Sequence, residues 1–192
     1  MKRTIAGYYQ QLQRWRLRQA WLRELRRREV LIHKSIELTG RGDVLPWLKF
    51  GPGSFVERDC TIWCAAEPES EPSLVAGANV FVGRNTYFGV WKRISIGDDT
   101  LIGAYCYIIS GNHRFFGPEL PVRVQGYEGS PITIGRNVWL GAHVIVLPGV
   151  TIGENAVVGA GSVVTTSVPR AEIWAGVPAR RIRSRFASPA EE

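Results

Sequence analysis

The feature that most constrains the fold of this chain is an aliphatic residue at every sixth position in its C-terminal part. The unbroken run consists of Ile134, Leu140, Val146, Ile152, Val158 and Val164. An amphipathic helix repeats its apolar stripe about every 3.6 residues and an antiparallel strand alternates at every second residue, so neither explains this period. The spacing predicts a parallel β-helix, in which three six-residue units close one triangular coil and each leading aliphatic side chain points inward.

The same spacing occurs earlier in three shorter blocks whose phases differ. These blocks are Phe50, Val56 and Ile62, then Ala76, Val82 and Phe88, and then Ile96, Ile102 and Ile108. Two of the breaks, Ala65–Ser73 and Ser110–Ser130, lack the repeat and predict loops that leave the coil. The second loop carries Asn112 and His113 among several aromatic residues.

These patterns divide the chain into three parts. Residues 1–40 form a basic N-terminal segment, and residues 7–31 within it are expected to be helical because they contain no six-residue unit. The β-helix is expected over residues 41–170, with an extruded loop at about 110–130. Residues 171–192 are expected to form a C-terminal cap and tail.

The charge of the chain is concentrated in its first part. Residues 1–34 hold ten of the 24 Lys and Arg residues and two of the 17 acidic residues, a net charge of +8. The remaining residues therefore carry −1 of the total +7. A near-neutral body does not fit a nucleic-acid-binding surface, so no nucleic-acid partner is expected.

The basic segment leaves two interpretations open. Ile5, Tyr8, Leu12, Trp15 and Leu22 recur at roughly helical spacing among basic residues. Such a helix fits peripheral contact with an anionic membrane through residues 1–34, on the inner face of that membrane. It also fits packing within an oligomer of this chain.

The cysteines and the N-terminus bear on the compartment. Cys60, Cys64 and Cys106 are an odd number without a Cys-x-x-Cys pair, which favours buried free thiols in a reducing compartment over a disulfide framework. The N-terminus lacks the apolar core of a secretory signal, and no stretch has the length and apolarity of a membrane span. A cytoplasmic location is expected.

The stretch from Pro131 to Arg183 closely resembles one known family. It reads PITIGRNVWLGAHVIVLPGVTIGENAVVGAGSVVTTSVPRAEIWAGVPARRIR, and the motif SGNH at residues 110–113 precedes the long loop. Together they resemble the hexapeptide-repeat acetyltransferases, among them the galactoside, maltose and polysaccharide O-acetyltransferases. The resemblance covers about residues 75–186 and implies a mainly β fold, a left-handed parallel β-helix.

The resemblance also implies an activity and an assembly. Members of this family are homotrimers with active sites between neighbouring subunits, and they use acetyl-CoA as co-substrate without a metal. The family's loop histidine matches His113, which would act as general base on the acceptor hydroxyl. A neutral imidazole suits that role at cytoplasmic pH. The group that orients His113 is left open between Asn112, Glu128 and a backbone carbonyl.

Further positions follow from the family pattern. For the cofactor it points to Gly141, Ala142, Ala160, Thr165, Thr166, Arg180 and Arg183. Thr166 stands where many relatives have lysine. On the acceptor side Trp139 matches a tryptophan at the groove. Gly89 and Trp91 replace the polar residues that hold small sugars. The aromatic residues Tyr87, Trp91, Tyr105 and Tyr127 are candidates for a sugar-binding platform. The SGNH form is more like members that modify capsule, exopolysaccharide or lipopolysaccharide sugars.

Other functions compete with sugar O-acetylation. An N-acyltransferase acting on an amino sugar would need the same repeat and cofactor. A non-catalytic β-helix scaffold would need the repeat but not the loop histidine. A zinc enzyme of the γ-carbonic anhydrase kind commonly needs three histidines in one site. This chain has only His33, His113 and His143, and the first precedes the repeats.

Overall fold

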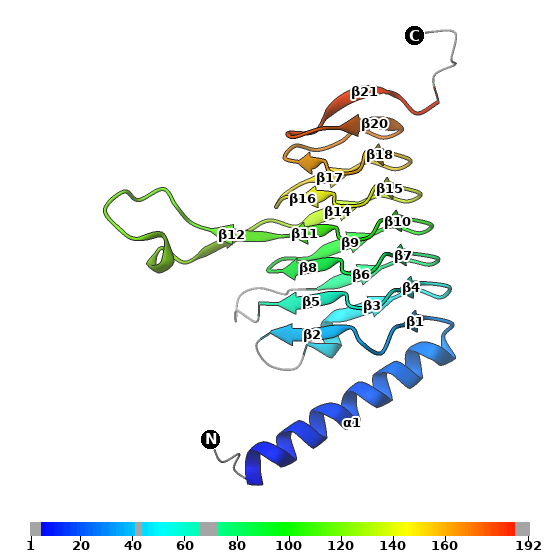
Figure 1. Ribbon diagram of the computed structural model, residues 1–192, viewed down its shortest axis with the longest axis vertical. Coiled ribbons are helices and arrows are strands. Elements are labelled where there is room, and N and C mark those ends of the chain that lie inside the picture. The colour runs from blue at the N-terminus through cyan, green and yellow to red at the C-terminus, as the bar shows by residue number, and fades with distance from the viewer. Residues whose placement is uncertain (1–4, 41–43, 66–72, 187–192) are drawn as a thin grey trace.

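The computed structural model describes residues 5–40, 44–65 and 73–186, and most of them wind into a three-sided solenoid of short strands (Figure 1). Each side is a sheet whose neighbouring strands come from successive coils and pair in parallel.

Sheet 1 consists of β1 (Leu31–Ile32), β4 (Phe55–Val56), β7 (Phe81–Val82), β10 (Leu101–Ile102), β15 (Trp139–Leu140), β18 (Val157–Val158), β20 (Glu172–Ala175) and β21 (Arg180–Ser184). Sheet 2 consists of β2 (Glu37–Gly40), β5 (Thr61–Cys64), β8 (Tyr87–Val90), β11 (Tyr107–Ile109), β16 (Ile145–Val146) and β19 (Val163–Val164). Sheet 3 consists of β3 (Leu48–Phe50), β6 (Leu74–Ala76), β9 (Ile94–Ile96), β14 (Ile132–Ile134) and β17 (Thr151–Ile152). Two short 3-10 helices lie at Leu45–Trp47 and Val122–Val124.

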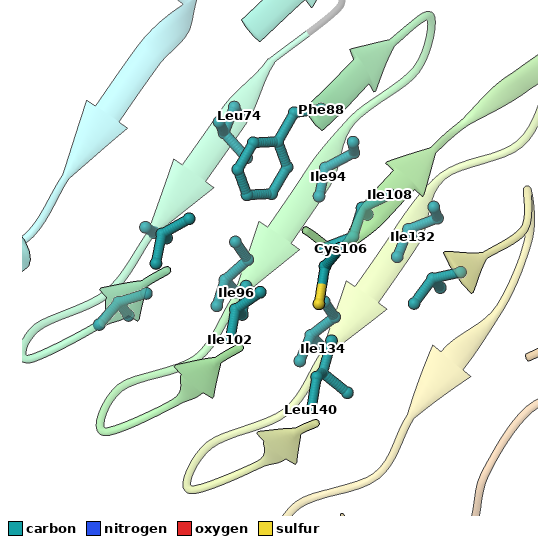
Figure 2. Close-up of a cluster of buried hydrophobic side chains, with 14 of the residues drawn as sticks. Leu74, Phe88, Ile94, Ile96, Ile102, Cys106, Ile108, Ile132, Ile134 and Leu140 are labelled. Carbon is teal, nitrogen blue, oxygen red and sulfur yellow. The ribbon is translucent and has the colours of Figure 1, made fainter. Parts of the chain in front are cut away.

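The core is the column of leading aliphatic side chains that the period of six predicts. All six residues of the unbroken run are at most 1% exposed, and side chains from successive coils stack on one another in Figure 2, as Ile94 and Ile132 do. Burying one such side chain contributes about 1.5–3 kcal/mol, so the interior of the solenoid is the main source of its stability. The prediction of a mainly β fold built from six-residue repeats is confirmed.

The solenoid begins earlier than the boundary expected at residue 41. Strands β1 and β2 pair in parallel with β4 and β5 and so form part of the first coil. The reason is visible in the sequence, because Ile32, Leu38 and Val44 continue the spacing of six backwards from Phe50.

Helix α1 (Ile5–Arg27) lies across the N-terminal end of the solenoid (Figure 1). Leu22 and Leu25 are buried against the first coil, and Trp21 packs on the same core. The helix therefore packs on its own chain. Arg18 adds a polar contact, since its Nη2 donates to the backbone oxygens of Lys34 at 3.0 Å and Ile36 at 2.6 Å. Among the described residues, no helix combines the length and apolarity that a membrane span requires.

The three cysteines are buried and free, as predicted. Burial raises the pKa of Cys60 to about 11, of Cys64 to about 12 and of Cys106 to about 11. Two of the thiols donate to backbone oxygens of the next coil, Cys60 to Gly83 and Cys106 to Gly141. These thiols are part of the core and carry no chemistry at the surface.

One edge of the solenoid turns on residues in the left-handed region of backbone conformation. Asn79, Asp99, Asn137 and Asn155 have φ between 53° and 62° and follow one another along this edge. Their short polar side chains tolerate that conformation and bond between coils, from Asn79 Nδ2 to Asp99 Oδ1 and from Asn137 Nδ2 to Asn155 Oδ1. The corners are thus specified by side chains as well as by glycine.

The last two strands close the other end. Strand β21 pairs antiparallel with β20, which reverses the chain after the last parallel strand of sheet 1. Glu172 accepts hydrogen bonds from Trp174 Nε1 at 2.7 Å and from Arg181 Nε at 2.9 Å. Of the loop expected at Ala65–Ser73, residues 66–72 lie outside the described residues.

Candidate active site

The long second break forms a hairpin that projects from the solenoid between sheets 2 and 3 (Figure 1). Its stem is β12 (Gly111–His113) paired antiparallel with β13 (Tyr127–Gly129). Directly opposite residues are Gly111 and Gly129, Asn112 and Glu128, and His113 and Tyr127. The stem holds His113 outside the solenoid, with its side chain exposed.

Ser110 fixes the root of this hairpin. Its side chain is 0% exposed, and its hydroxyl accepts the backbone N–H groups of Trp91 and Lys92, each at 3.0 Å. The single proton of the same hydroxyl can be donated to the backbone oxygen of Lys92, at 2.8 Å, or to that of Gly89, at 3.2 Å. One buried serine thus joins the hairpin to the preceding coil.

Trp91 packs against the root at the glycines of the stem. A Cβ on Gly111 would collide with the Cγ atom of Trp91, and one on Gly129 would lie 3.3 Å from its Cβ. The indole therefore occupies space that side chains on the stem would need. Its position makes Trp91 a support of the hairpin as well as a candidate substrate residue.

The imidazole of His113 lies against the ring of Tyr127. The ring centroids are 4.3 Å apart with an angle of 37° between the planes. Asn112, one of the residues considered for orienting the imidazole, uses its Oδ1 to accept the backbone N–H of His113 at 2.9 Å. Asn112 therefore acts on the backbone of the stem, and the ring contact of His113 comes from Tyr127.

Tyr87 and Trp91 lie on either side of Gly89. A Cβ on Gly89 would be 3.0 Å from Cζ3 of Trp91 and 3.1 Å from Cε1 of Tyr87, so the glycine leaves room for both rings. Tyr87 stacks on Tyr107 of the next coil with centroids 4.8 Å apart and planes at 8°. Burial raises the pKa of Tyr87, with a smaller contribution from Tyr107. Both candidate substrate residues thus gather beside the hairpin.

Trp139 lies elsewhere on the chain. It is 53% exposed on β15 of sheet 1, on the side of the solenoid away from the hairpin in Figure 1. One chain therefore does not bring Trp139 and His113 together.

The cofactor candidates occupy three places near the C-terminal end. Gly141, Ala142 and Ala160 stack at the edge between sheets 1 and 2, where a Cβ on Gly141 would be 2.6 Å from the backbone nitrogen of Ala160. Thr165 and Thr166 follow β19 at the other edge of sheet 2 and are exposed.

Arg180 and Arg183 lie on the capping strand β21. Arg180 pairs with Ala175, and Arg183 pairs with Ile173. A Cβ on Gly159 would be 3.0 Å from the side chain of Ala175, which puts this part of the cap beside the coil that carries Ala160. The exposed guanidinium of Arg180 is thus near the first group of cofactor candidates.

The three histidines lie in separate parts of the molecule. His33 bonds to Ser35 in the first coil, and His143 stacks on Tyr105 at the edge between sheets 1 and 2, with centroids 5.0 Å apart. Within the described ranges, no group of three or more His, Cys, Asp or Glu side chains is placed to hold a metal ion. The arrangement gives no support to the zinc alternative.

The coils of six residues and the histidine on an extruded hairpin define a class, the hexapeptide-repeat transferases, and sequence comparison agrees. A family model described as bacterial transferase hexapeptide (six repeats) matches residues 131–166. A second, described as hexapeptide repeat of succinyl-transferase, matches residues 93–111.

Individual relatives extend the match. A putative acetyltransferase of Schizosaccharomyces pombe is 36% identical over 149 residues, which cover 69% of this chain and 70% of that protein. The galactoside O-acetyltransferase of Escherichia coli is 43% identical over 113 residues, covering 56% and 55%. The chain belongs to the hexapeptide-repeat acetyltransferase superfamily. It spans 38%, 55% and 57% of the lengths of three of the relatives it matches.

Solved structures share the fold. A hexapeptide-repeat acetyltransferase of Vibrio cholerae, determined with acetyl-CoA, aligns with a TM-score of 0.58 at 25% identity and covers 96% of this chain and 91% of that one. AntD, an N-acyltransferase from Bacillus cereus, aligns with a TM-score of 0.70 at 24% identity and covers 85% and 84%. The second likeness concerns the fold alone.

Two residues of this site, Ser110 and Trp63, are not evident as functional residues in the sequence alone. Ser110 is the first residue of SGNH, and a serine that directly follows a buried strand is a candidate for bonding backbone groups. The ring of Trp63 lies 4.3 Å from that of Trp91. No short motif contains both tryptophans, because strand pairing across a coil brings them together.

Proposed function

We propose that this protein transfers an acetyl group from acetyl-CoA to a hydroxyl of a sugar, with His113 as general base. The observation that carries the proposal is an exposed histidine on a stem that is rigidly anchored at Ser110 and Trp91, in a member of an acetyltransferase superfamily. The names of the Escherichia coli relative and of the acetyl-CoA-bound Vibrio structure support the reaction and the acyl donor.

The chemistry requires displacement of CoA by the acceptor oxygen and two transfers of one proton, to His113 and then to the CoA sulfur. His113 takes the proton of the acceptor hydroxyl as that oxygen bonds to the thioester carbonyl carbon, and the carbon–sulfur bond then breaks. The proton passes to the departing CoA thiolate, so the products are an ester and CoA. General-base catalysis of this kind contributes roughly 10²–10⁴ in rate. Tyr127 restricts the imidazole by packing on it, while Asn112 holds the backbone of the same residue.

The CoA-binding residues form the second part of the proposal. The edge at Gly141, Ala142 and Ala160 carries only small residues, so a linear chain can approach the backbone there, and Thr165 and Thr166 offer hydroxyls. Arg180 and Arg183 supply positive charge suited to phosphates. In this scheme the acetyl donor lies along the C-terminal coils.

A homotrimer with left-handed coils completes the proposed architecture. Sheet 1 presents an apolar outer column, made of Leu31, Phe55, Phe81, Leu101, Trp139 and Val157. Sheet 2 presents Tyr87, Tyr107, Ile145 and Val163, whereas the outer column of sheet 3 is mostly polar. Two different apolar faces that meet at one edge suit a closed ring in which face 1 of one subunit packs on face 2 of the next.

This assembly also accounts for the separation of Trp139 from His113. Because the two residues lie on different sides of one chain, a shared groove would combine the histidine of one subunit with the tryptophan of its neighbour. The active site is therefore proposed to lie between subunits.

A role in capsule, exopolysaccharide or lipopolysaccharide synthesis is proposed for the acceptor side. It is supported by the replacement of small-sugar ligands by Gly89 and Trp91 and by the aromatic surroundings of His113. Membrane contact through residues 1–34 and a cytoplasmic location stay predictions from the sequence.

The first test is calorimetric titration of the purified protein with acetyl-CoA. We expect the affinity for acetyl-CoA to weaken about tenfold or more when both Arg180 and Arg183 are replaced by alanine, because each substitution removes charged contacts to phosphate. The matched control is the double variant Arg16→Ala, Arg23→Ala on α1, which removes the same charge at the far end. Absence of binding to the wild type would overturn the proposal.

Product analysis separates the rival activities. An ester product is released by mild alkali, whereas the amide formed by an N-acyltransferase survives the same treatment. A protein that binds no acyl-CoA and retains its biological role as His113→Ala would be a scaffold.

A further inference from the structure

A continuous row of aromatic rings runs from the general base along the edge between sheets 2 and 3. His113 contacts Tyr127 with centroids 4.3 Å apart, Tyr127 contacts Trp91 at 5.9 Å, and Trp91 contacts Trp63 at 4.3 Å. The rings come from the hairpin, from the residue after β8 and from β5. The row therefore crosses several coils and extends well away from His113.

The row is held in place by positions that lack side chains. Gly89 pairs with Trp63 in the parallel ladder, and a Cβ on Gly89 would lie 3.0 Å from the ring of Trp91. On the other side, Gly111 leaves the space that the same indole fills. These contacts fix the rings before any ligand arrives, which lowers the entropy cost of binding.

The row does not belong to the hydrophobic core. Tyr127 is 46% exposed, His113 is exposed, and Trp63 and Trp91 are partly exposed. Contiguous exposed aromatic side chains of this kind mark binding surfaces more often than scattered apolar residues do. The negative faces of the rings attract weakly positive C–H groups, such as those on the apolar face of a pyranose ring.

Resting on the proposed function, we infer that Trp91 and Trp63 bind a second, non-reacting sugar unit of the acceptor. The reacting unit lies at His113 and Tyr127, and the next unit of the chain stacks at the tryptophans. The acceptor class is then an oligosaccharide or polysaccharide, and a single sugar makes only part of the contacts. Trp63 is expected to contact the second sugar unit and not the reacting one, because its ring is the furthest along the row from His113.

The test is an array of neutral oligosaccharides of graded length that includes bacterial surface glycans. Binding of the purified full-length protein to each oligosaccharide is measured directly. We expect at least one series in which two or more units bind roughly tenfold more tightly than one unit. Trp63→Ala should remove this gain, and Trp63→Phe should restore part of it because a ring is kept. Trp15→Ala, which removes an exposed indole from α1, should leave the gain intact.

The outcomes separate the inference from the proposed function. Acetyl-CoA binding is measured in the same preparations without any sugar. Intact acetyl-CoA binding with no dependence on chain length, or with a dependence that Trp63→Ala does not change, overturns the inference alone. If the wild-type protein does not bind acetyl-CoA, the proposed function is overturned and the inference with it. A Trp63→Ala protein whose melting temperature matches that of the wild type excludes unfolding as the cause.

Discussion

The indole of Trp91 fills the space that a side chain on Gly111 would occupy. Trp91 follows a strand of sheet 2, and Gly111 begins the hairpin stem one coil later, two positions before His113. The direction in which the stem leaves the solenoid thus depends on the contact of the Trp91 indole with a residue that has no side chain.

Gly111→Ala adds only one methyl group, but it should impair activity strongly. The added methyl group collides with Trp91, and overpacking of this kind costs about 1–3 kcal/mol in folding free energy. We expect acetyl transfer to fall about tenfold or more because His113 moves with the stem. Gly117→Ala in the same hairpin is the control, since its Cβ would meet nothing closer than 3.7 Å. Equal effects of the two changes would contradict this account.

Ser110→Ala tests the anchor on the other side of the root. The substitution leaves the partly buried N–H groups of Trp91 and Lys92 without their acceptor, at a cost of about 1–3 kcal/mol. Urea unfolding should show the loss. Ser95→Ala is a suitable comparison, because its hydroxyl makes a long bond, of 3.5 Å, on the outer face of sheet 3. An anchor role is refuted if both variants unfold at the same urea concentration.

His113→Ala should lower the turnover of acetyl transfer by roughly 10²–10⁴ while acetyl-CoA affinity stays within a factor of about two, because the base acts on the acceptor and not on the cofactor. Steady-state kinetics and calorimetry provide the two numbers. His33→Ala, in the first coil, serves as the matched histidine change and should retain activity. Full activity of His113→Ala would remove the histidine from the mechanism.

The buried thiols predict a response to alkaline pH. Their pKa values in the folded chain, about 11 to 12, lie above the ordinary value of 9.0. Between pH 9 and pH 11 the unfolded chain releases protons that the folded chain keeps, so the free energy of unfolding should fall as pH rises through this window. Below pH 9 this destabilisation is absent.

A thiol-reactive disulfide reagent checks the same burial at pH 8. The folded protein should react at none of Cys60, Cys64 and Cys106, and addition of denaturant should expose all three. Rapid labelling of the native protein would show that the coils open at these positions.

The fold was predictable because one physical requirement repeats along the chain. Each coil must send aliphatic side chains inward, so Ile134 and its successors mark the solenoid without any knowledge of tertiary contacts. The first coil is harder to recognise in the sequence because charged residues surround Ile32 and Leu38 and obscure their spacing. The spacing of six in this first coil is the same as in later coils, and only the neighbouring residues differ.

The site was less predictable for a different reason. The SGNH motif located His113, but the groups that support it come from positions with large separations in sequence, such as Gly89, Trp91 and Tyr127. Their proximity follows from the register between coils and from the hairpin pairing. Neither is encoded in a local pattern of residues, so the contacts could be read only from the structure.

The hydrogen bonds of Arg18 have a consequence for the association of one molecule with another copy of itself. In later coils the backbone oxygens of Cys60 and Thr86 each accept an N–H from the coil before, namely those of Glu37 and Thr61. Ile36 occupies the equivalent place in the first coil, and the guanidinium of Arg18 donates to its oxygen instead. A side chain thus replaces the hydrogen bond that a preceding strand would make. The N-terminal end of the solenoid is therefore not a free template on which a second molecule can add its strands and grow into a fibre.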